Sequence, residues 1–226
     1  MAPEANLISV KVLHGVFGFG MSMDIIKGME LAVEKGARVI SMSLGSEDSQ
    51  GTEAEDPECI VINELAQKGI FFLIASGNSG PGERTIGAPG CASGAITVGS
   101  VSLTDYPAPA WFSSRGRQAK SNPNGDPKPD ILSPGGGRSL EVLKPDEVLL
   151  SSGFGWMASI YTGLVDFHAA MKGTSQATPA CAGLIACLLE AGKIQTPQDF
   201  KRICAEKGHT KSPEDGWGVV KLSWFL

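Results

Sequence analysis

Apolar segments of two kinds alternate along the first half of the chain. The first kind consists of continuous apolar runs that predict buried strands, at residues 7–13, 39–43, 70–75 and near 95–100. The second kind has apolar residues at helical spacing and predicts two helices, one that Ser22 caps and Gly36 ends, and one over residues 59–67. Strands that alternate with helices form a mostly parallel sheet covered on both faces. The pattern therefore predicts a three-layer α/β fold.

The second half of the chain combines loops with one strongly apolar helix. Residues 106–137 are rich in proline, glycine, serine and asparagine, which predicts surface loops around a short strand at 130–132. Residues 175–191 are apolar almost all round, which predicts a buried helix with Pro179 near its first turn. Ser175 is then expected at the N-terminus of this helix.

Small polar residues follow two of the predicted strands. Ser43, Leu44 and Gly45 lie at the end of one strand, and Gly77 and Asn78 come soon after the end of another. The carboxyl ends of parallel strands meet at one edge of a sheet, where ligand crevices form. The amide of Asn78 is a donor of the kind that stabilises a developing oxyanion. We therefore expect these residues to line a site.

The predicted position of Ser175 has two interpretations. A helix N-terminus carries unpaired N–H groups and positive partial charge, which favour an oxyanion beside it, so Ser175 is a candidate nucleophile for acyl transfer. Serine is also a preferred N-cap residue, and its residue type alone favours that interpretation. The sequence around Ser175 changes this balance.

Four segments resemble motifs of the subtilases, the subtilisin-like serine proteases. GTSQATPACAG at residues 173–183 resembles the nucleophile motif of that family. ASGNSG at 75–80 resembles its oxyanion-hole segment, and SMSLG at 41–45 resembles the segment that lines its substrate pocket. GFG at 18–20 resembles the backbone strip that pairs with an extended substrate. The motifs occur in the family's order.

The resemblance implies a serine-type endopeptidase that hydrolyses peptide bonds through an acyl-enzyme on Ser175. It implies that Asn78 and the backbone N–H of Ser175 hold the oxyanion. It assigns the other candidate residues to substrate binding: Ser43, Leu44, Gly45, Gly18, Phe19, Gly20, Gly77 and Thr174. The implied partner is a peptide or protein substrate, bound by strand addition.

The likeness covers nearly the whole chain. Residues 1–226 are therefore expected to be the C-terminal portion of a subtilase catalytic domain, the portion that bears the nucleophile and the oxyanion hole. Residues 141–171 match the family least and are interpreted as an insertion.

The chain departs from the family upstream of residues 7–13, where active subtilases carry a catalytic Asp and then a His. An unassisted serine hydroxyl is a poor nucleophile, so both groups are expected from a missing or separate N-terminal segment, which would be a further partner. Without that segment the chain is expected to expose apolar surface. His14, His168 and His209 are not expected to replace the base. The alternative is a catalytically inactive subtilase-like module that binds peptides or is structural.

Composition narrows the remaining possibilities. A net charge of −5 without a long lysine or arginine run disfavours nucleic-acid partners, and no segment is apolar over the length of a membrane span. The five cysteines lack disulfide or zinc spacing, which favours the cytoplasm over secretion. No cofactor is expected, since the scattered aspartates are interpreted as solvated loop residues rather than calcium ligands. These are Asp105, Asp126, Asp130 and Asp146.

Overall fold

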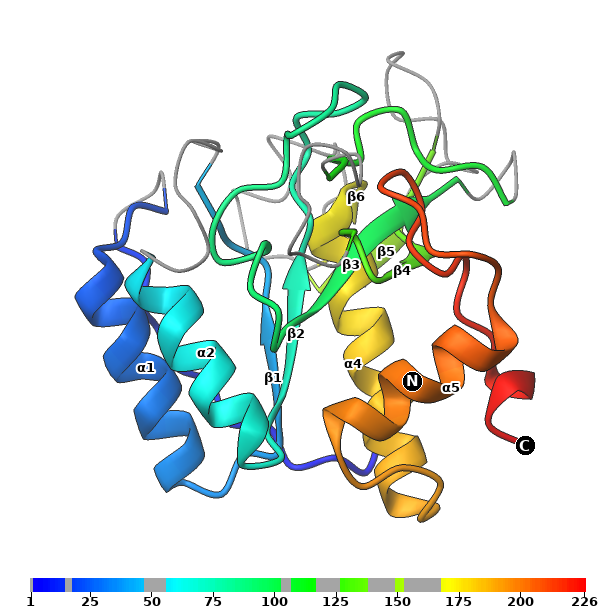
Figure 1. Cartoon of the computed structure of the whole chain (residues 1–226). Helices are drawn as coiled ribbons and strands as arrows, with labels where there is room; N and C mark the ends of the chain where they lie inside the picture. Colours follow the sequence, from blue (N-terminus) through cyan, green and yellow to red (C-terminus); the bar gives the residue numbers. More distant parts are fainter. Residues whose placement is uncertain are drawn as a thin grey trace.

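A parallel sheet of four strands, in the order β1-β2-β3-β4, lies at the centre of the fold (Figure 1). The computed structural model describes residues 2–14, 18–46, 56–102, 107–116, 127–137, 149–152 and 168–226. The strands are β1 (Val39–Met42), β2 (Phe71–Ala75), β3 (Ile96–Val101) and β4 (Ile131–Pro134). All three pairings are parallel, with Ser41 opposite Leu73 and Val98 opposite Ile131. The predicted parallel sheet is confirmed.

Helices cover both faces of this sheet (Figure 1). On one face, α1 (Ser22–Glu34) and α2 (Pro57–Gln67) share a core with Phe72 and Ile74 of β2. On the other face, α4 (Thr174–Glu190) packs against all four strands. α5 (Pro197–Lys207) and the short η2 (Leu222–Trp224) follow, and the rings of Phe200 and Phe225 stack with centroids 5.3 Å apart. The three-layer α/β prediction is therefore confirmed.

Side chains cap the N-termini of α2 and α5 but not that of α1. α2 begins where the Asp56 carboxylate accepts a hydrogen bond from the Cys59 N–H, and α5 begins with a capping box between Thr196 and Asp199. α1 begins at Ser22 itself, with Met21 as the N-cap residue and no capping side chain. The prediction that Ser22 caps this helix was therefore wrong.

Only one face of α4 is buried. Its buried residues include Ala177, Cys181, Ile185 and Leu188, which face the sheet, whereas Pro179 is exposed. Small apolar side chains such as Ala and Cys can lie on a half-exposed face of a helix. The apolar composition of α4 therefore did not require every face of the helix to be buried. That part of the prediction was wrong. Pro179 is the sixth residue of the helix, just beyond the first turn where it was expected.

Residues 7–13 do not form the predicted strand. No strand of the described chain pairs with them, and the side chains of Leu7 and Ile8 are 93% and 44% exposed. Val12 lies against Gly28 of α1, and this packing anchors the segment to the core. An apolar run satisfies the strand pattern, but a strand also requires a partner for its hydrogen bonds.

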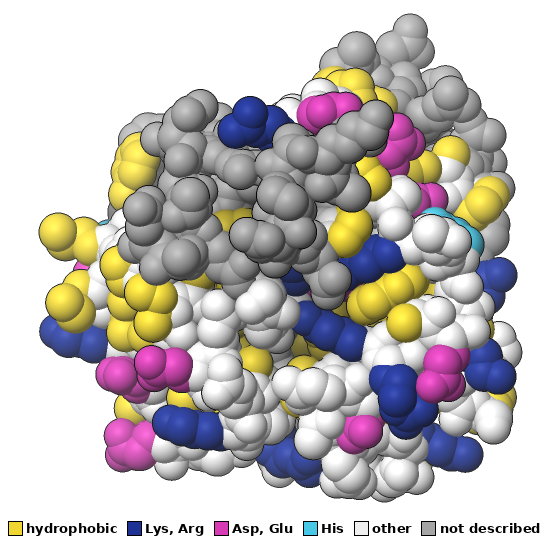
Figure 2. Space-filling model, viewed as in Figure 1, with side chains coloured by type: hydrophobic (Ala, Val, Ile, Leu, Met, Phe, Trp, Pro, Cys, Tyr) yellow, Lys and Arg dark blue, Asp and Glu magenta, His cyan; other side chains and the backbone are white. Residues whose placement is uncertain are grey.

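Several large apolar side chains are exposed on and just before α1. Figure 2 shows hydrophobic side chains gathered over the region of α1. The exposed residues there are Phe19, Met21, Met23 and Leu31. Such a cluster is typical of a surface that contacts another element or chain.

Asp130, which directly precedes β4, is fully buried in an ion-pair network. Its two carboxylate oxygens accept hydrogen bonds from the ammonium groups of Lys128 at 2.7 Å and Lys211 at 2.8 Å. The N–H of Thr97 donates a third bond at 2.8 Å. The solvated-loop interpretation was therefore wrong for Asp130. The other three aspartates of that interpretation lie outside the described residues: Asp105, Asp126 and Asp146.

Two described pieces of residues 141–171 pair with each other. β5 (Leu149–Ser152) and β6 (His168–Met171) form an antiparallel two-stranded sheet, and β6 leads towards the start of α4. The remainder of the predicted insertion lies outside the described residues. Within the part that the structure describes, no helix is both long and apolar enough to cross a membrane.

Candidate active site

Ser175 lies in the first turn of α4. The N-cap residue of this helix is Gly173, so Ser175 is not the N-cap that its residue type favours. The N–H of Gly173 donates to the carbonyl of Gly135, 2.7 Å away, which joins the helix start to the end of β4. A Cβ on Gly135 would lie 2.6 Å from the Gly173 carbonyl oxygen, so only glycine permits this approach. Ser175 is thus held where helix N–H groups have no partner within the helix.

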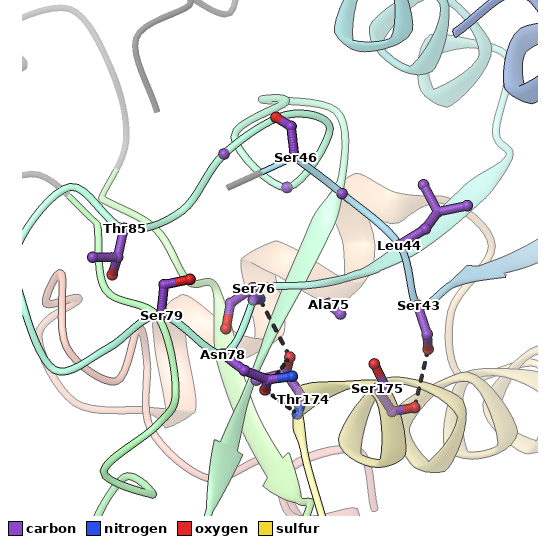
Figure 3. A pocket seen from close by; sticks show the side chains of 14 residues that line it. Ser43, Leu44, Ser46, Ala75, Ser76, Asn78, Ser79, Thr85, Thr174 and Ser175 are labelled. Carbon is purple, nitrogen blue, oxygen red and sulfur yellow. Dashed lines mark hydrogen bonds between the residues drawn. The ribbon is translucent and has the colours of Figure 1, made fainter. Parts of the chain in front are cut away.

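Asn78 is fixed beside this turn by Thr174. Its side-chain oxygen accepts hydrogen bonds from the Thr174 N–H at 3.0 Å and the Thr174 hydroxyl at 3.1 Å. Because these donors require the amide oxygen, the amide nitrogen lies on the side of Ser175 (Figure 3). The preceding Gly77 has φ +100° and would place a Cβ 2.9 Å from the Ser114 hydroxyl. The loop after β2 therefore aims one amide donor at the serine.

Ser43 connects the end of β1 to the backbone of Ser175. The Ser43 hydroxyl donates to the Ser175 carbonyl at 3.0 Å (Figure 3). Inside a helix that carbonyl would accept the N–H four residues later, but that residue is Pro179, which has no N–H. Because Pro179 provides no donor, the Ser175 carbonyl is available to accept the hydrogen bond from the Ser43 hydroxyl. This bond connects the first turn of α4 to the end of β1.

Replacing Ser43 with alanine is expected to lower the free energy of unfolding by about 0.5–1.5 kcal/mol, because the Ser175 carbonyl loses its donor. Urea denaturation of the two proteins measures the difference. Ser46→Ala is the matched control, since its hydroxyl makes only a long 3.4 Å contact with the Ala88 carbonyl. Equal losses in both variants would contradict the role given to Ser43.

These residues line an open pocket of about 210 Å³. One wall is the segment after β1, and the other is the loop between β2 and β3. The two walls meet where the Ser46 N–H donates to the Ala88 carbonyl at 2.8 Å. A Cβ on Gly87 would lie 2.1 Å from the Ser46 carbonyl oxygen, so the walls touch through backbone. None of the described lining residues carries a charge.

The structure brings seven of the ten predicted site residues to this pocket. They are Ser43, Leu44, Gly45, Gly77, Asn78, Thr174 and Ser175. Gly18, Phe19 and Gly20 do not line it: they precede α1, where Phe19 pairs with His14 and is 76% exposed. Their role as a substrate strip stays a prediction.

Sequence reasoning missed part of the pocket lining. Ala75, Ser76 and Ser79 belong to the segment 75–80 that the sequence identified, although none of them was named as a site residue. Ser46, Thr85, Gly87 and Gly90 were missed, and the last three lie further along the loop between β2 and β3. The sequence signal that could have identified these three residues is the glycine- and proline-rich composition of the loop after β2, which leaves the sheet at the same edge.

Two described histidine side chains lie away from the pocket lining. His14 lies 3.6 Å from the Asp24 carboxylate and His209 lies 3.2 Å from that of Asp215, and both rings are at least half exposed. The side chain of His168 is outside the described atoms. The described residues also bring no group of three His, Cys, Asp or Glu side chains together as metal ligands.

The fold and the pocket define a three-layer α/β protein with a serine at a helix N-terminus and an asparagine amide beside it. The model of the subtilase family matches residues 1–218, so the chain belongs to that family. Pyrolysin of Pyrococcus furiosus is 36% identical over 240 residues, covering 93% of this chain and 15% of pyrolysin. Serine protease AprX of Bacillus subtilis is 36% identical over 219 residues, covering 89% of this chain and 46% of AprX.

Solved structures agree on the fold. A lanthipeptide protease superposes with a TM-score of 0.70 at 19% identity, covering 95% of this chain and 67% of that structure. A protease of Pseudoalteromonas arctica superposes with a TM-score of 0.69 at 25% identity, covering 94% of this chain and 60% of that structure. The chain thus spans less than half the length of either curated relative.

Proposed function

We propose that this chain is the nucleophile-bearing part of a serine endopeptidase that cleaves peptide bonds through an acyl-enzyme. The Ser175 hydroxyl oxygen attacks the scissile carbonyl carbon and gives its proton to a base. The carbonyl oxygen becomes an oxyanion, held by the Asn78 amide N–H and the Ser175 backbone N–H. The amine leaves with a proton, and water then releases the acyl group from Ser175.

The hydrogen bonds from Thr174 to Asn78 carry this proposal. They hold the amide in one orientation before any substrate binds, and a preorganised donor is what makes an oxyanion hole effective. An asparagine with a purely structural role would be expected to use its amide N–H groups as well as its oxygen. The uncharged pocket beside Ser175 fits the side chain of the residue before the scissile bond.

The proposal includes an Asp and a His supplied by a further segment or chain, which completes the triad. β1 pairs only with β2 among the described strands, so its outer edge can accept an added strand. The exposed apolar residues near α1 provide further surface for such a segment. If no segment or chain supplies the Asp and the His, the alternative function is a groove that binds peptides without cleaving them.

Labelling by a fluorophosphonate serine-hydrolase probe tests the proposal. Protein that is purified with the segment or chain supplying the Asp and the His is expected to label on Ser175, and Ser175→Ala is expected to abolish labelling, because the probe reacts only with an activated serine. Ser79→Ala removes a different serine of the pocket lining and is expected to retain labelling. The intact mass of the labelled material shows whether a companion segment is present.

Two outcomes would contradict the proposal. Labelling that persists in Ser175→Ala would place the nucleophile elsewhere. No labelling in the presence of a segment or chain that supplies the Asp and the His would leave peptide binding as the function of the groove.

A further inference from the structure

Two cysteines meet behind the loop wall of the pocket. The sulfur atoms of Cys59 and Cys91 are 3.5 Å apart. Cys59 lies in the first turn of α2, where its N–H donates to the Asp56 carboxylate at 2.9 Å. Cys91 lies at the end of the loop between β2 and β3. The contact therefore joins the start of α2 to a loop that lies 32 residues further along the chain.

The loop at Cys91 is part of the pocket wall. Gly87 and Gly90 line the pocket, and the Cys91 N–H donates to the Gly87 carbonyl at 3.1 Å. The thiol of Cys59 lies 4.0 Å from the carbonyl oxygen of Pro89 in the same loop. A covalent bond between the sulfurs would therefore fasten the pocket wall to α2.

The two thiols differ in accessibility. Cys59 is fully buried, whereas Cys91 is half-buried and can be reached from solvent. The hydrogen bond with Cys91, burial and the nearby charge of Asp56 together raise the pKa of the Cys59 thiol. A reagent from solution therefore meets Cys91 first.

We propose that Cys59 and Cys91 form a dithiol site that reacts with small-molecule disulfides and closes to an intramolecular disulfide bracing the pocket wall. A disulfide bond is about 2.05 Å long, so the sulfurs need to approach by only about 1.5 Å. The site is independent of the proposed protease chemistry, because neither sulfur is part of the pocket lining.

The reaction has two exchange steps. The Cys91 thiolate attacks one sulfur of the reagent, forms a mixed disulfide and releases the first thiolate of the reagent. The Cys59 sulfur then attacks the Cys91 sulfur and displaces the second thiolate of the reagent, which takes up the Cys59 proton. Two protein thiols are oxidised, and one reagent disulfide is reduced to two thiols.

Incubation of the Ser175→Ala protein with oxidised glutathione tests the site, and this background separates the result from any protease activity. Peptide mapping is expected to recover Cys59 and Cys91 in one cross-linked peptide, with the intact mass lower by two hydrogens. The melting temperature is expected to rise by about 5 °C or more, because the bond closes the loop between residues 59 and 91. Dithiothreitol should reverse both changes.

Single variants provide the controls. Cys91→Ser and Cys59→Ala are each expected to abolish the cross-link and the rise in melting temperature. Cys187→Ser, which changes another half-buried cysteine on α4, is expected to alter neither. A stable glutathione adduct on Cys91 without a cross-link would overturn the proposal, and so would a cross-link without the rise in melting temperature.

Discussion

Replacing Asn78 with aspartate is expected to slow the reaction of Ser175 with a fluorophosphonate by about 10²–10³-fold. Aspartate keeps the oxygen that accepts the two hydrogen bonds from Thr174, so the loop after β2 should keep its conformation. It lacks the N–H groups of the amide, and its negative charge repels a developing oxyanion. The labelling rate of the two proteins at equal concentration, each in the presence of the segment or chain that supplies the Asp and the His, measures the effect.

Asn63→Asp is the matched control for this variant. Asn63 lies on α2, and its side-chain oxygen accepts from the Gly94 N–H at 2.6 Å, so aspartate again retains the acceptor. The control is expected to label at nearly the original rate. If Asn78→Asp also labels at that rate while remaining folded, Asn78 does not stabilise the oxyanion.

Replacing Asp130 with asparagine is expected to lower the free energy of unfolding by about 3–5 kcal/mol, because the ammonium groups of Lys128 and Lys211 would lose their buried partner. Burial lowers the pKa of Lys128 to about 8, with the charge of Asp130 opposing this fall, so Lys128 is still charged at pH 7. Urea denaturation at that pH measures the loss. Glu206→Gln breaks the exposed pair with Arg202 instead and is expected to cost less than about 1 kcal/mol.

The contribution of Asp130 should also depend on pH. Burial alone would raise the pKa of this carboxyl, but the charges of Lys128, Lys201 and Lys211 outweigh burial and hold the pKa well below its usual range. A carboxyl with a lowered pKa in the folded state stabilises the protein above its unfolded pKa of about 4. The difference between the original protein and Asp130→Asn should therefore shrink as the pH falls below about 4. A difference that stays constant at acid pH would contradict this origin.

Local sequence patterns predicted most of the fold. The strand cores at residues 39–42 and 71–75 and the long helix after Gly173 were predicted within one or two residues, because their periodicity and end signals are local. Residues 7–13 have the same apolar pattern without a strand neighbour, and a partner for a strand cannot be recognised from its own sequence. Asp130 was misinterpreted for a similar reason, since Lys211 reaches it from far along the chain.

The site was predicted where motifs lie at strand or helix ends. Ser43, Asn78 and Ser175 each follow or begin a regular element, so their meeting at one edge followed from the parallel topology. The wall at Gly87 and Gly90 belongs to an irregular loop, and its position depends on tertiary contacts such as the Ser46 hydrogen bond to Ala88. The pairing of Cys59 with Cys91 has the same origin, because their spacing matches no sequence motif.

The hydrogen bond between Ser43 and the Ser175 carbonyl joins residues 132 positions apart in the chain. Contacts of such long sequence separation form late and slow the folding of a domain. During synthesis, the first three strands can be made long before Ser175 leaves the ribosome. A nascent chain can therefore carry both walls of the pocket before Ser175, the proposed nucleophile, has been added to them.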